Sequence, residues 1–561
     1  MNEKSIKSRI IVVSVFFITL YLLIFLKLFH WQIVKAEELK TLSENQSSEQ
    51  LRVEARRGEI LASDGFPLAT NKISYLLYAN PKLADNKNTY SDLLAKALDM
   101  DTATISAKLS QDLFWVKIKE RLTPEEKQKV ESLKLDGIGF QEQVDRFYPE
   151  ASMAAHLVGF LGKNKNGDDQ GFFGLEGFYN SQMQGRDGRL YVVKDALSNP
   201  VVNDIREEKT IHGRNIKLTI DRTIQYFAEK RLKEGVLKYE AEGGSVIVMD
   251  TKTGKILASA SVPDFDPTNY YDFAQNSYKD PVVSDLYEPG STFKVLIMAS
   301  AIDMGKITPE TKCTICDGPV KVSGYTIKTW NNKYFPNATM KEVLQHSDNT
   351  GMVFIGQKMG PANTREYLKR FGIGLLTGID LQGEVTGELR SSWSDVDLAT
   401  ITFGQGISVT PLQLINGVNA IANDGVLMRP YVVGQIEDQN GKEIKIEPKE
   451  IRRVMKGSTA KIMSWLMVNN VEAGESKWTK IKDYRIAGKT GTAQVPVAGH
   501  YDPNVTIASF VGFFPAQDPT VTMLVLINKP KTSIYGSETA APIFFQVARD
   551  IIQALNIPPS Y

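Results

Sequence analysis

Residues 288–299 read EPGSTFKVLIMA and combine a turn, two reactive side chains and an apolar run. The Glu-Pro-Gly sequence at 288–290 predicts a non-helical turn. The apolar residues 295–299 predict that a buried helix follows this turn directly. Ser291 and Lys294 are three positions apart, so on a helix they share a face and the amine can reach the hydroxyl. An amine that accepts the serine proton makes a usable nucleophile. The stretch therefore places a candidate nucleophile at the mouth of a buried helix.

The Ser-x-x-Lys spacing is short enough to recur by chance. A second copy occurs at Ser458 and Lys461 of the same chain. An isolated motif of this length gives weak support for catalysis. Ser291 is therefore a convincing candidate only if further catalytic elements accompany it.

The length and composition indicate a globular protein of several domains. At roughly 100–200 residues per domain, the 561 residues predict about three or four units. The 66 basic and 65 acidic residues give a formal net charge of +1. This balance provides no large positive field for holding nucleic acid, so no nucleic-acid partner is expected.

An uncharged apolar run, Ile10–Leu26, lies near the N-terminus. Apolar residues up to Trp31 extend it to about the 20 residues that span a bilayer. A cleaved signal peptide is the alternative, but the run is too long and no small-x-small cleavage site follows it. The positive-inside rule then predicts an uncleaved anchor with its N-terminus in the cytoplasm and the rest of the chain outside. This orientation rests on three basic residues before the run: Lys4, Lys7 and Arg9.

The two cysteines of the chain, Cys313 and Cys316, lie in the sequence CTIC. Outside the cytoplasm they could form a local disulfide, and a zinc half-site is the alternative. Five histidines are scattered through the chain, so a four-ligand metal site is not expected. The pair is therefore expected to have a structural role or none.

The expected elements indicate an α+β protein. Residues 37–52 are polar and helix-prone, and a helical period dominates from 91 to 135. The glycine-rich region 159–188 is expected to be loop-rich, with Glu176 in a buried ion pair and no phosphate-binding loop. After a boundary near 200–215, a helix-rich segment at 340–425 interrupts one antiparallel sheet. The expected strands lie at 216–220, 245–249, 255–260, 485–487, 508–513 and 521–527, with a final helix after Pro542.

Two further elements follow Ser291-x-x-Lys294 in the chain: Ser347-Asp348-Asn349 and Lys489-Thr490-Gly491-Thr492. Both have decoys, a second Lys-Thr-Gly at 252–254 and a second Ser-x-Asn at 43–45. The first decoy precedes Ser291 in a hairpin turn, and the second lies next to the membrane anchor. Of the possible combinations of these copies, only the one that starts at Ser291, Ser347 and Lys489 places all three elements in this order within one domain.

With these three elements the sequence resembles the class B penicillin-binding proteins, which are membrane-anchored D,D-transpeptidases that cross-link peptidoglycan. The resemblance extends over most of the chain beyond the anchor. The segment HSDNTGM (346–352), with Tyr367 and Phe371, is more similar to the division-associated branch. Asp348 departs from that branch, which often has serine or cysteine there. Other family-like stretches are Arg57-Gly58, Arg146 with Tyr148 and Pro149, Gly174 to Glu176, Pro263 to Pro267, Thr377 to Asp380, and Gly404 to Gly406.

The resemblance implies a fold as well as a family. It implies an antiparallel sheet framed by helices with an inserted helical subdomain, preceded by an elongated α+β pedestal and one transmembrane helix. The implied divisions are a cytoplasmic tail at 1–9, an anchor at 10–31, a dimerisation-like pedestal at 32–210 and a transpeptidase domain at 211–561.

The resemblance also implies a site without metal or cofactor. Lys294 would take the proton of Ser291, which attacks a D-Ala-D-Ala stem peptide; Ser347 would relay a proton and Asn349 would orient Lys294. Lys489 would hold Lys294 partly neutral, and Thr490, Gly491 and Thr492 would bind the substrate. The backbone N–H groups of Ser291 and Thr492 would form the oxyanion hole. The implied partners are peptidoglycan stem peptides on the lipid-linked precursor polymer, β-lactams and a SEDS-type glycosyltransferase.

Two alternatives use the same motifs differently. A β-lactamase would also hydrolyse the ester, but no Glu-x-x-Leu-Asn stretch lies between the second and third elements. A β-lactam-binding sensor or scaffold would bind without turnover, and such a protein has no need of Lys294. Persistence of a covalent penicillin label distinguishes these three classes.

Overall fold

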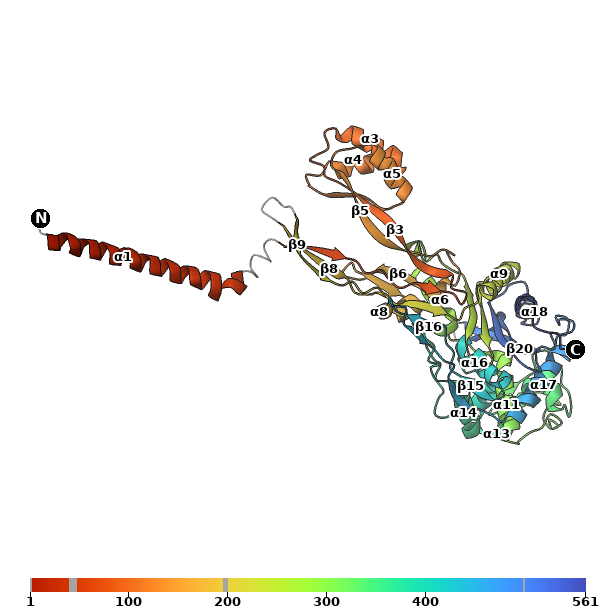
Figure 1. Cartoon of the computed structure of the whole chain (residues 1–561). Coiled ribbons are helices and arrows are strands. Elements are labelled where there is room, and N and C mark those ends of the chain that lie inside the picture. Colours follow the sequence, from red (N-terminus) through yellow and green to blue (C-terminus); the bar gives the residue numbers. More distant parts are fainter. Residues whose placement is uncertain (1–2, 40–47, 195–199, 498–499, 561) are drawn as a thin grey trace. The chain divides into compact units, whose positions relative to one another are not determined.

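The computed structural model describes residues 3–39, 48–194, 200–497 and 500–560 (Figure 1). The decoy at 43–45 and the middle of the helix-prone segment 37–52 lie outside these residues. The chain divides into two compact units, each of which is described by itself. One contains Met1–Ala55 and Gly185–His212, and the other contains Arg56–Gln184 and Gly213–Tyr561.

The first unit begins with helix α1 (Glu3–Phe29) and a π-helical turn, η1 (His30–Val34). Among the described residues, one helical segment is long and apolar enough to cross a membrane, and it covers Ile6–Val34. None of it is buried inside the protein, as expected of a helix that is apolar all round and surrounded by lipid. The expected anchor helix is therefore confirmed, and it starts earlier than residue 10.

The same unit contains a three-stranded antiparallel sheet in the order β1 (Ser48–Val53), β8 (Gly188–Lys194), β9 (Pro200–Glu208). The helical interpretation of residues 37–52 is wrong at its end, because β1 pairs with β8 across more than 130 positions of sequence, a contact that overrides local propensity. The expected domain boundary at residue 210 lies between β9 and the next strand, and it stays a prediction.

A five-stranded antiparallel sheet is the centre of the second unit. Alternate residues of its strands enter two different cores (Figure 1). Val246 lies in the core that contains α9 (Arg222–Lys238) and α18 (Ala540–Ala554). Ile247 lies in the core that contains α11 (Lys294–Asp303) and α16 (Pro411–Ala422). Both faces are thus buried, which explains why the strands read as nearly continuous apolar runs. The strands, in spatial order, are β12 (Ile256–Val262), β11 (Gly243–Asp250), β21 (Val521–Asn528), β20 (His500–Phe514) and β19 (Ala487–Val497).

Helices cover both faces of this sheet, as the α+β prediction requires. α16 is buried along its whole length and starts with a capping box between Thr410 and Gln413. The final helix begins at Ala540, not after Pro542 as expected, because a proline is tolerated in the first turn of a helix. The helices are α9 (Arg222–Lys238), α11 (Lys294–Asp303), α12 (Met340–Gln345), α13 (Asn349–Met359), α14 (Pro361–Arg370), α15 (Asp395–Ile401), α16 (Pro411–Ala422), α17 (Gly457–Ala473) and α18 (Ala540–Ala554).

Cys313 and Cys316 form a disulfide and are both fully buried. The backbone N–H of Cys313 donates to the carbonyl of Ala338 at 2.8 Å, which anchors the small loop. Of the two alternatives for this pair, the disulfide is confirmed and the zinc half-site is wrong.

A second, seven-stranded sheet joins the N-terminal part of this unit to later segments. Its strand β10 pairs in parallel with β2 and antiparallel with β16, so residues before 80 and after 430 share one sheet. The strands are β17 (Glu443–Lys445), β16 (Val433–Glu437), β10 (Asn215–Leu218), β2 (Ile60–Leu61), β3 (Pro67–Ala79) and β4 (Val116–Leu122), with β5 (Ile138–Phe147) also paired to β3.

Residues 87–132 form a small helical subdomain on the ends of β3 and β5 (Figure 1). The helical period over 91–135 is confirmed for α3 (Lys87–Leu98), α4 (Thr102–Leu109) and α5 (Pro124–Ser132). It is wrong for β4, which pairs with β3 and buries its alternate residues Val116 and Ile118. Two-residue alternation over so short a segment was masked by the helical pattern on both sides.

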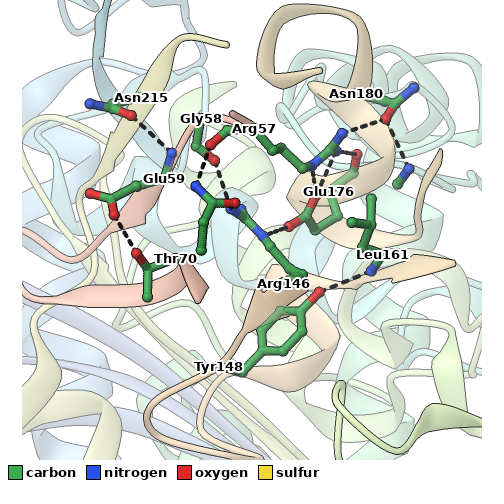
Figure 2. A network of polar contacts seen from close by, with 12 residues as sticks. Arg57, Gly58, Glu59, Thr70, Arg146, Tyr148, Leu161, Glu176, Asn180 and Asn215 are labelled. Atoms are coloured by element: carbon green, nitrogen blue, oxygen red, sulfur yellow. Dashed lines mark hydrogen bonds and ion pairs between the residues drawn. The ribbon is translucent and has the colours of Figure 1, made fainter. Parts of the chain in front are cut away.

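Figure 2 shows a buried ion-pair network in the N-terminal part of this unit. Glu176, on α7 (Gly174–Phe178), is fully buried between the guanidinium groups of Arg57 and Arg146. Arg57 Nε donates to Glu176 Oε2 at 2.7 Å, and Arg146 Nε donates to Glu176 Oε1 at 2.7 Å. Arg146 also donates to the carbonyl of Gly58 at 2.9 Å. The buried ion pair expected for Glu176 is confirmed, and it joins α7 to the segment before β2 and to the end of β5.

We expect Glu176→Gln to destabilise the protein by about 3–5 kcal/mol, because it leaves two buried guanidinium groups without a counter-charge. Glu366→Gln is the matched control, since Glu366 pairs with Arg370 on the exposed face of α14 and should change stability by less than about 0.5 kcal/mol. Thermal and urea unfolding of the full-length protein in detergent measures both. Equal effects of the two substitutions would contradict the role given to the network.

Candidate active site

Ser291 lies in a 3-10 turn, η4 (Gly290–Phe293), which leads directly into α11 at Lys294. The turn is fixed from outside: the N–H of Gly290 donates to the carbonyl of Gly404 at 3.0 Å, and Glu288 accepts from the N–H of Gly406 at 3.0 Å. The apolar run after Lys294 is fully buried, as expected. Ser291 therefore sits half-buried at the start of a rigid core helix.

Lys294 is fully buried and contacts the second sequence element directly. Its Nζ donates to the carbonyl of Ser347 at 2.6 Å and to Asn349 Oδ1 at 2.8 Å, and it lies 3.2 Å from Ser347 Oγ. A neutral amine has two N–H donors and one lone pair, so two of these contacts use its donors and the lone pair is left for a hydroxyl proton. Burial and the nearby charge of Lys489 lower the pKa of Lys294 to about 7.

The second element forms the turn between α12 and α13. Ser347 has a left-handed backbone (φ 53°), and Asp348 caps α13 by accepting from the N–H of Thr350 at 2.7 Å. Asn349 begins α13 and also donates from Nδ2 to the carbonyl of Lys328 at 3.0 Å. The Asp348 carboxylate raises the pKa of Lys294, against the larger effects of burial and Lys489. The departure from the family pattern at Asp348 thus supplies a helix cap and a nearby negative charge.

The third element lies on β19, the edge strand of the central sheet, which packs against η4. A Cβ on Gly491 would lie 2.3 Å from Ser509 Oγ and 2.8 Å from Thr292 Cγ2, so glycine permits this close approach. Lys489 is fully buried, and burial lowers its pKa. Thr492 Oγ1 accepts from the N–H of Gly536 at 3.0 Å, which leaves its hydroxyl proton available to a ligand.

These elements surround one cleft of about 480 Å³. Ser291, Ser347, Asn349, Thr490 and Thr492 all line it, with Lys294 and Lys489 buried beneath. Two of the second copies lie elsewhere, because Lys252 and Lys461 line a different groove. The structure thus brings together every residue that the sequence selected for the site.

The cleft also contains residues that the motifs did not identify. Trp330 and Tyr535 lie on different loops with their ring centroids 5.6 Å apart, and both line the cleft. Glu475, in the loop after α17, accepts a hydrogen bond from Thr490 Oγ1 at 2.9 Å. These three residues belong to no motif in the sequence, and only the fold places them at the cleft.

Comparison with known proteins identifies both parts of the chain. Residues 244–552 match the family described as penicillin binding protein transpeptidase domain, and residues 52–218 match the penicillin-binding protein dimerisation domain. Stage V sporulation protein D of Bacillus subtilis is 33% identical over 100% of this chain and 88% of its own length. Peptidoglycan D,D-transpeptidase FtsI of Escherichia coli is 29% identical over 94% of this chain and 88% of its own.

A solved structure shows the same fold. Penicillin binding protein 3 of Mycobacterium tuberculosis, complexed with aztreonam, superposes with a TM-score of 0.71 at 25% identity and covers 91% of this chain and 98% of its own. The family match spans more than half of the chain and includes all three elements of the cleft. The chain therefore belongs to the penicillin-binding protein transpeptidase family, as the resemblance of its sequence predicted.

Proposed function

We propose that this chain is a peptidoglycan D,D-transpeptidase that works through an acyl-enzyme on Ser291. The observation that carries the proposal is the position of Lys294, a fully buried amine held by Ser347 and Asn349 at the base of a cleft that Ser291 lines. An amine with a pKa near 7 can both accept and return a proton at neutral pH. The related D,D-transpeptidases support the same reaction class.

In the proposed first half-reaction, Lys294 accepts the hydroxyl proton of Ser291 while Ser291 Oγ attacks the carbonyl of the penultimate D-alanine. The backbone N–H groups of Ser291 and Thr492 would stabilise the oxyanion. Collapse of the tetrahedral intermediate breaks the peptide bond, and the proton held by Lys294 passes through the Ser347 hydroxyl to the departing amine of the terminal D-alanine. The product is an ester on Ser291.

In the proposed second half-reaction, an amine of a neighbouring stem peptide attacks this ester. Lys294 removes the proton of that amine and returns it to Ser291, so the enzyme ends in its starting state. The stem peptide would lie along the open edge of β19 as an added strand, with its carboxylate near Lys489 and the Thr492 hydroxyl. A β-lactam would instead leave a persistent ester.

We also propose that the N-terminal helix α1 anchors the enzyme in the membrane. Lys4, Lys7 and Arg9 precede the uncharged run Ile10–Leu26, and by the positive-inside rule we expect the N-terminus to be in the cytoplasm. The anchor and the pedestal would contact a SEDS-type glycosyltransferase that supplies the glycan polymer, in division or a related process. Co-purification of such a protein with the full-length chain from membranes tests this association.

We expect labelled penicillin to attach covalently to the wild type and to persist, and we expect Ser291→Ala to abolish the label because it removes the attacking oxygen. Ser458→Ala is the matched control, since it removes the serine of the second Ser-x-x-Lys copy and should label normally. Gel fluorescence and peptide mapping measure both. Covalent labelling of the Ser291→Ala protein would exclude Ser291 as the nucleophile. Rapid loss of label from the wild type would indicate a β-lactamase.

The rate of labelling should rise with pH through a midpoint near 7. Below that pH Lys294 is protonated and cannot accept the Ser291 proton, whereas above it the neutral amine is the main form. Stopped-flow measurement of the labelling rate between about pH 5.5 and 8.5 tests this dependence. On the acid side of the midpoint the rate should fall about tenfold for each pH unit.

Lys294→Arg provides the corresponding variant, because a guanidinium keeps its charge and cannot act as a base. We expect a loss of about 10²–10⁴-fold in the labelling rate at pH 8. A rate that is independent of pH, or a Lys294→Arg protein of normal rate, would exclude Lys294 as the base.

A further inference from the structure

Of the described residues that line the cleft, one is acidic: Glu475. It lies in the loop between α17 and β19 and belongs to none of the three sequence elements. Its Oε2 accepts a hydrogen bond from Thr490 Oγ1 at 2.9 Å. A carboxylate in this position lies directly beside the strand that carries Lys489.

Thr490 connects this carboxylate to Lys489. The Lys489 Nζ donates to Thr490 Oγ1 at 3.1 Å and to the Thr490 carbonyl at 3.2 Å. A hydroxyl has a single proton, and Thr490 directs it to Glu475, so the same oxygen can accept from Lys489. A fully buried ammonium group is costly without a nearby negative charge, and the charge of Glu475 raises the pKa of Lys489 against the effect of burial.

Lys294 has different surroundings. Its closest partners, Ser347 and Asn349, are uncharged. Among charged groups, Lys489 opposes its protonation, while the carboxylates of Asp348 and Glu475 favour it less strongly. Lys328 also lines the cleft. The two buried lysines thus differ in one respect: Lys489 reaches a carboxylate through a single hydroxyl, and Lys294 does not.

We infer that Glu475 is a positioning residue that, through the Thr490 hydroxyl, holds Lys489 as the cation of the site and so leaves Lys294 as the amine that exchanges protons. Lys489 stays protonated throughout the reaction, and its charge attracts the substrate carboxylate. The proton of Ser291 goes to Lys294 alone and leaves with the departing amine. This inference rests on the proposed function, since it assumes that Lys294 is the base.

Glu475→Gln tests the charge, because glutamine can still accept from Thr490 but carries no charge. The measurement is the rate of covalent penicillin labelling of the full-length protein between about pH 5.5 and 10. At high pH the labelling rate should fall as Lys489 loses its proton, and we call this part of the pH profile the alkaline limb. In Glu475→Gln the midpoint of the alkaline limb should shift to lower pH by about one unit or more. The acid limb is the rise in rate as Lys294 loses its proton. Its midpoint should also shift to lower pH, but by less, because Lys294 is not linked to Glu475 through Thr490. Glu472→Gln, an exposed carboxylate at the end of α17, should leave both limbs in place.

Thr490 offers a second test. Thr490→Val removes the connecting hydroxyl while it keeps Glu475, and it should shift the midpoint of the alkaline limb to lower pH, as Glu475→Gln does. Thr490→Ser keeps a hydroxyl, so its midpoint should be that of the wild type. Adding Glu475→Gln to Thr490→Val should change the limb little further, because the connection is already broken.

The outcomes separate this inference from the proposed function. A wild type without label overturns the proposed function. A wild type that labels normally, with a Glu475→Gln alkaline limb that does not move, overturns the inference alone, even if the plateau rate falls. A Glu475→Gln ester that persists much longer than that of the wild type also overturns it, since Glu475 would then be a hydrolytic base.

Discussion

Lys294 and Lys489 are both fully buried beneath one cleft, close enough that the charge of Lys489 lowers the pKa of Lys294. Two buried ammonium groups at this separation are costly, because each loses hydration and each repels the other. The surrounding structure limits this cost in two ways. Lys294 donates hydrogen bonds to the Ser347 carbonyl and to Asn349 Oδ1, which satisfies the two N–H donors that its neutral amine has. Glu475 faces Lys489 through the Thr490 hydroxyl.

That arrangement depends on three segments which are far apart in the sequence. Lys294 is the first residue of the buried helix α11, and it contacts Asn349, the first residue of α13. β19 approaches η4 closely because Gly491 has no side chain. A sheet that is buried on both faces holds these segments rigidly, so the contacts of the two lysines are set by the core rather than by mobile loops.

The sequence predicted those parts of the fold that have strong local signals. The apolar runs of β11, β20 and β21, the anchor helix and the helix-rich segment were all visible as patterns. The three motifs identified the cleft residues because their order and residue types are specific. β1 and β4 were not predicted, because both are short and depend on pairing with distant strands.

Glu475 is different, since nothing in its local sequence distinguishes it from an exposed acid at the end of a helix. Its position follows from the register of β19, which directs Thr490 Oγ1 toward the loop after α17. Trp330 and Tyr535 were missed for the same reason, as each lies on a loop that only the tertiary fold brings to the cleft. Spacing motifs identify groups that react, whereas groups that adjust their charge or access are specified by packing.

The open edge of β19 is the last feature that the proposed function explains. An unpaired edge strand is usually a liability, because its free N–H and C=O groups can pair with other chains. Here η4 packs against β19 at Gly491, and the edge borders the cleft that Ser291 lines. A stem peptide that pairs with β19 would therefore present its carbonyl to Ser291 and its carboxylate to Lys489. The edge of this strand would then serve recognition, and a charge maintained on Lys489 by Glu475 would favour an extended peptide that ends in a carboxylate.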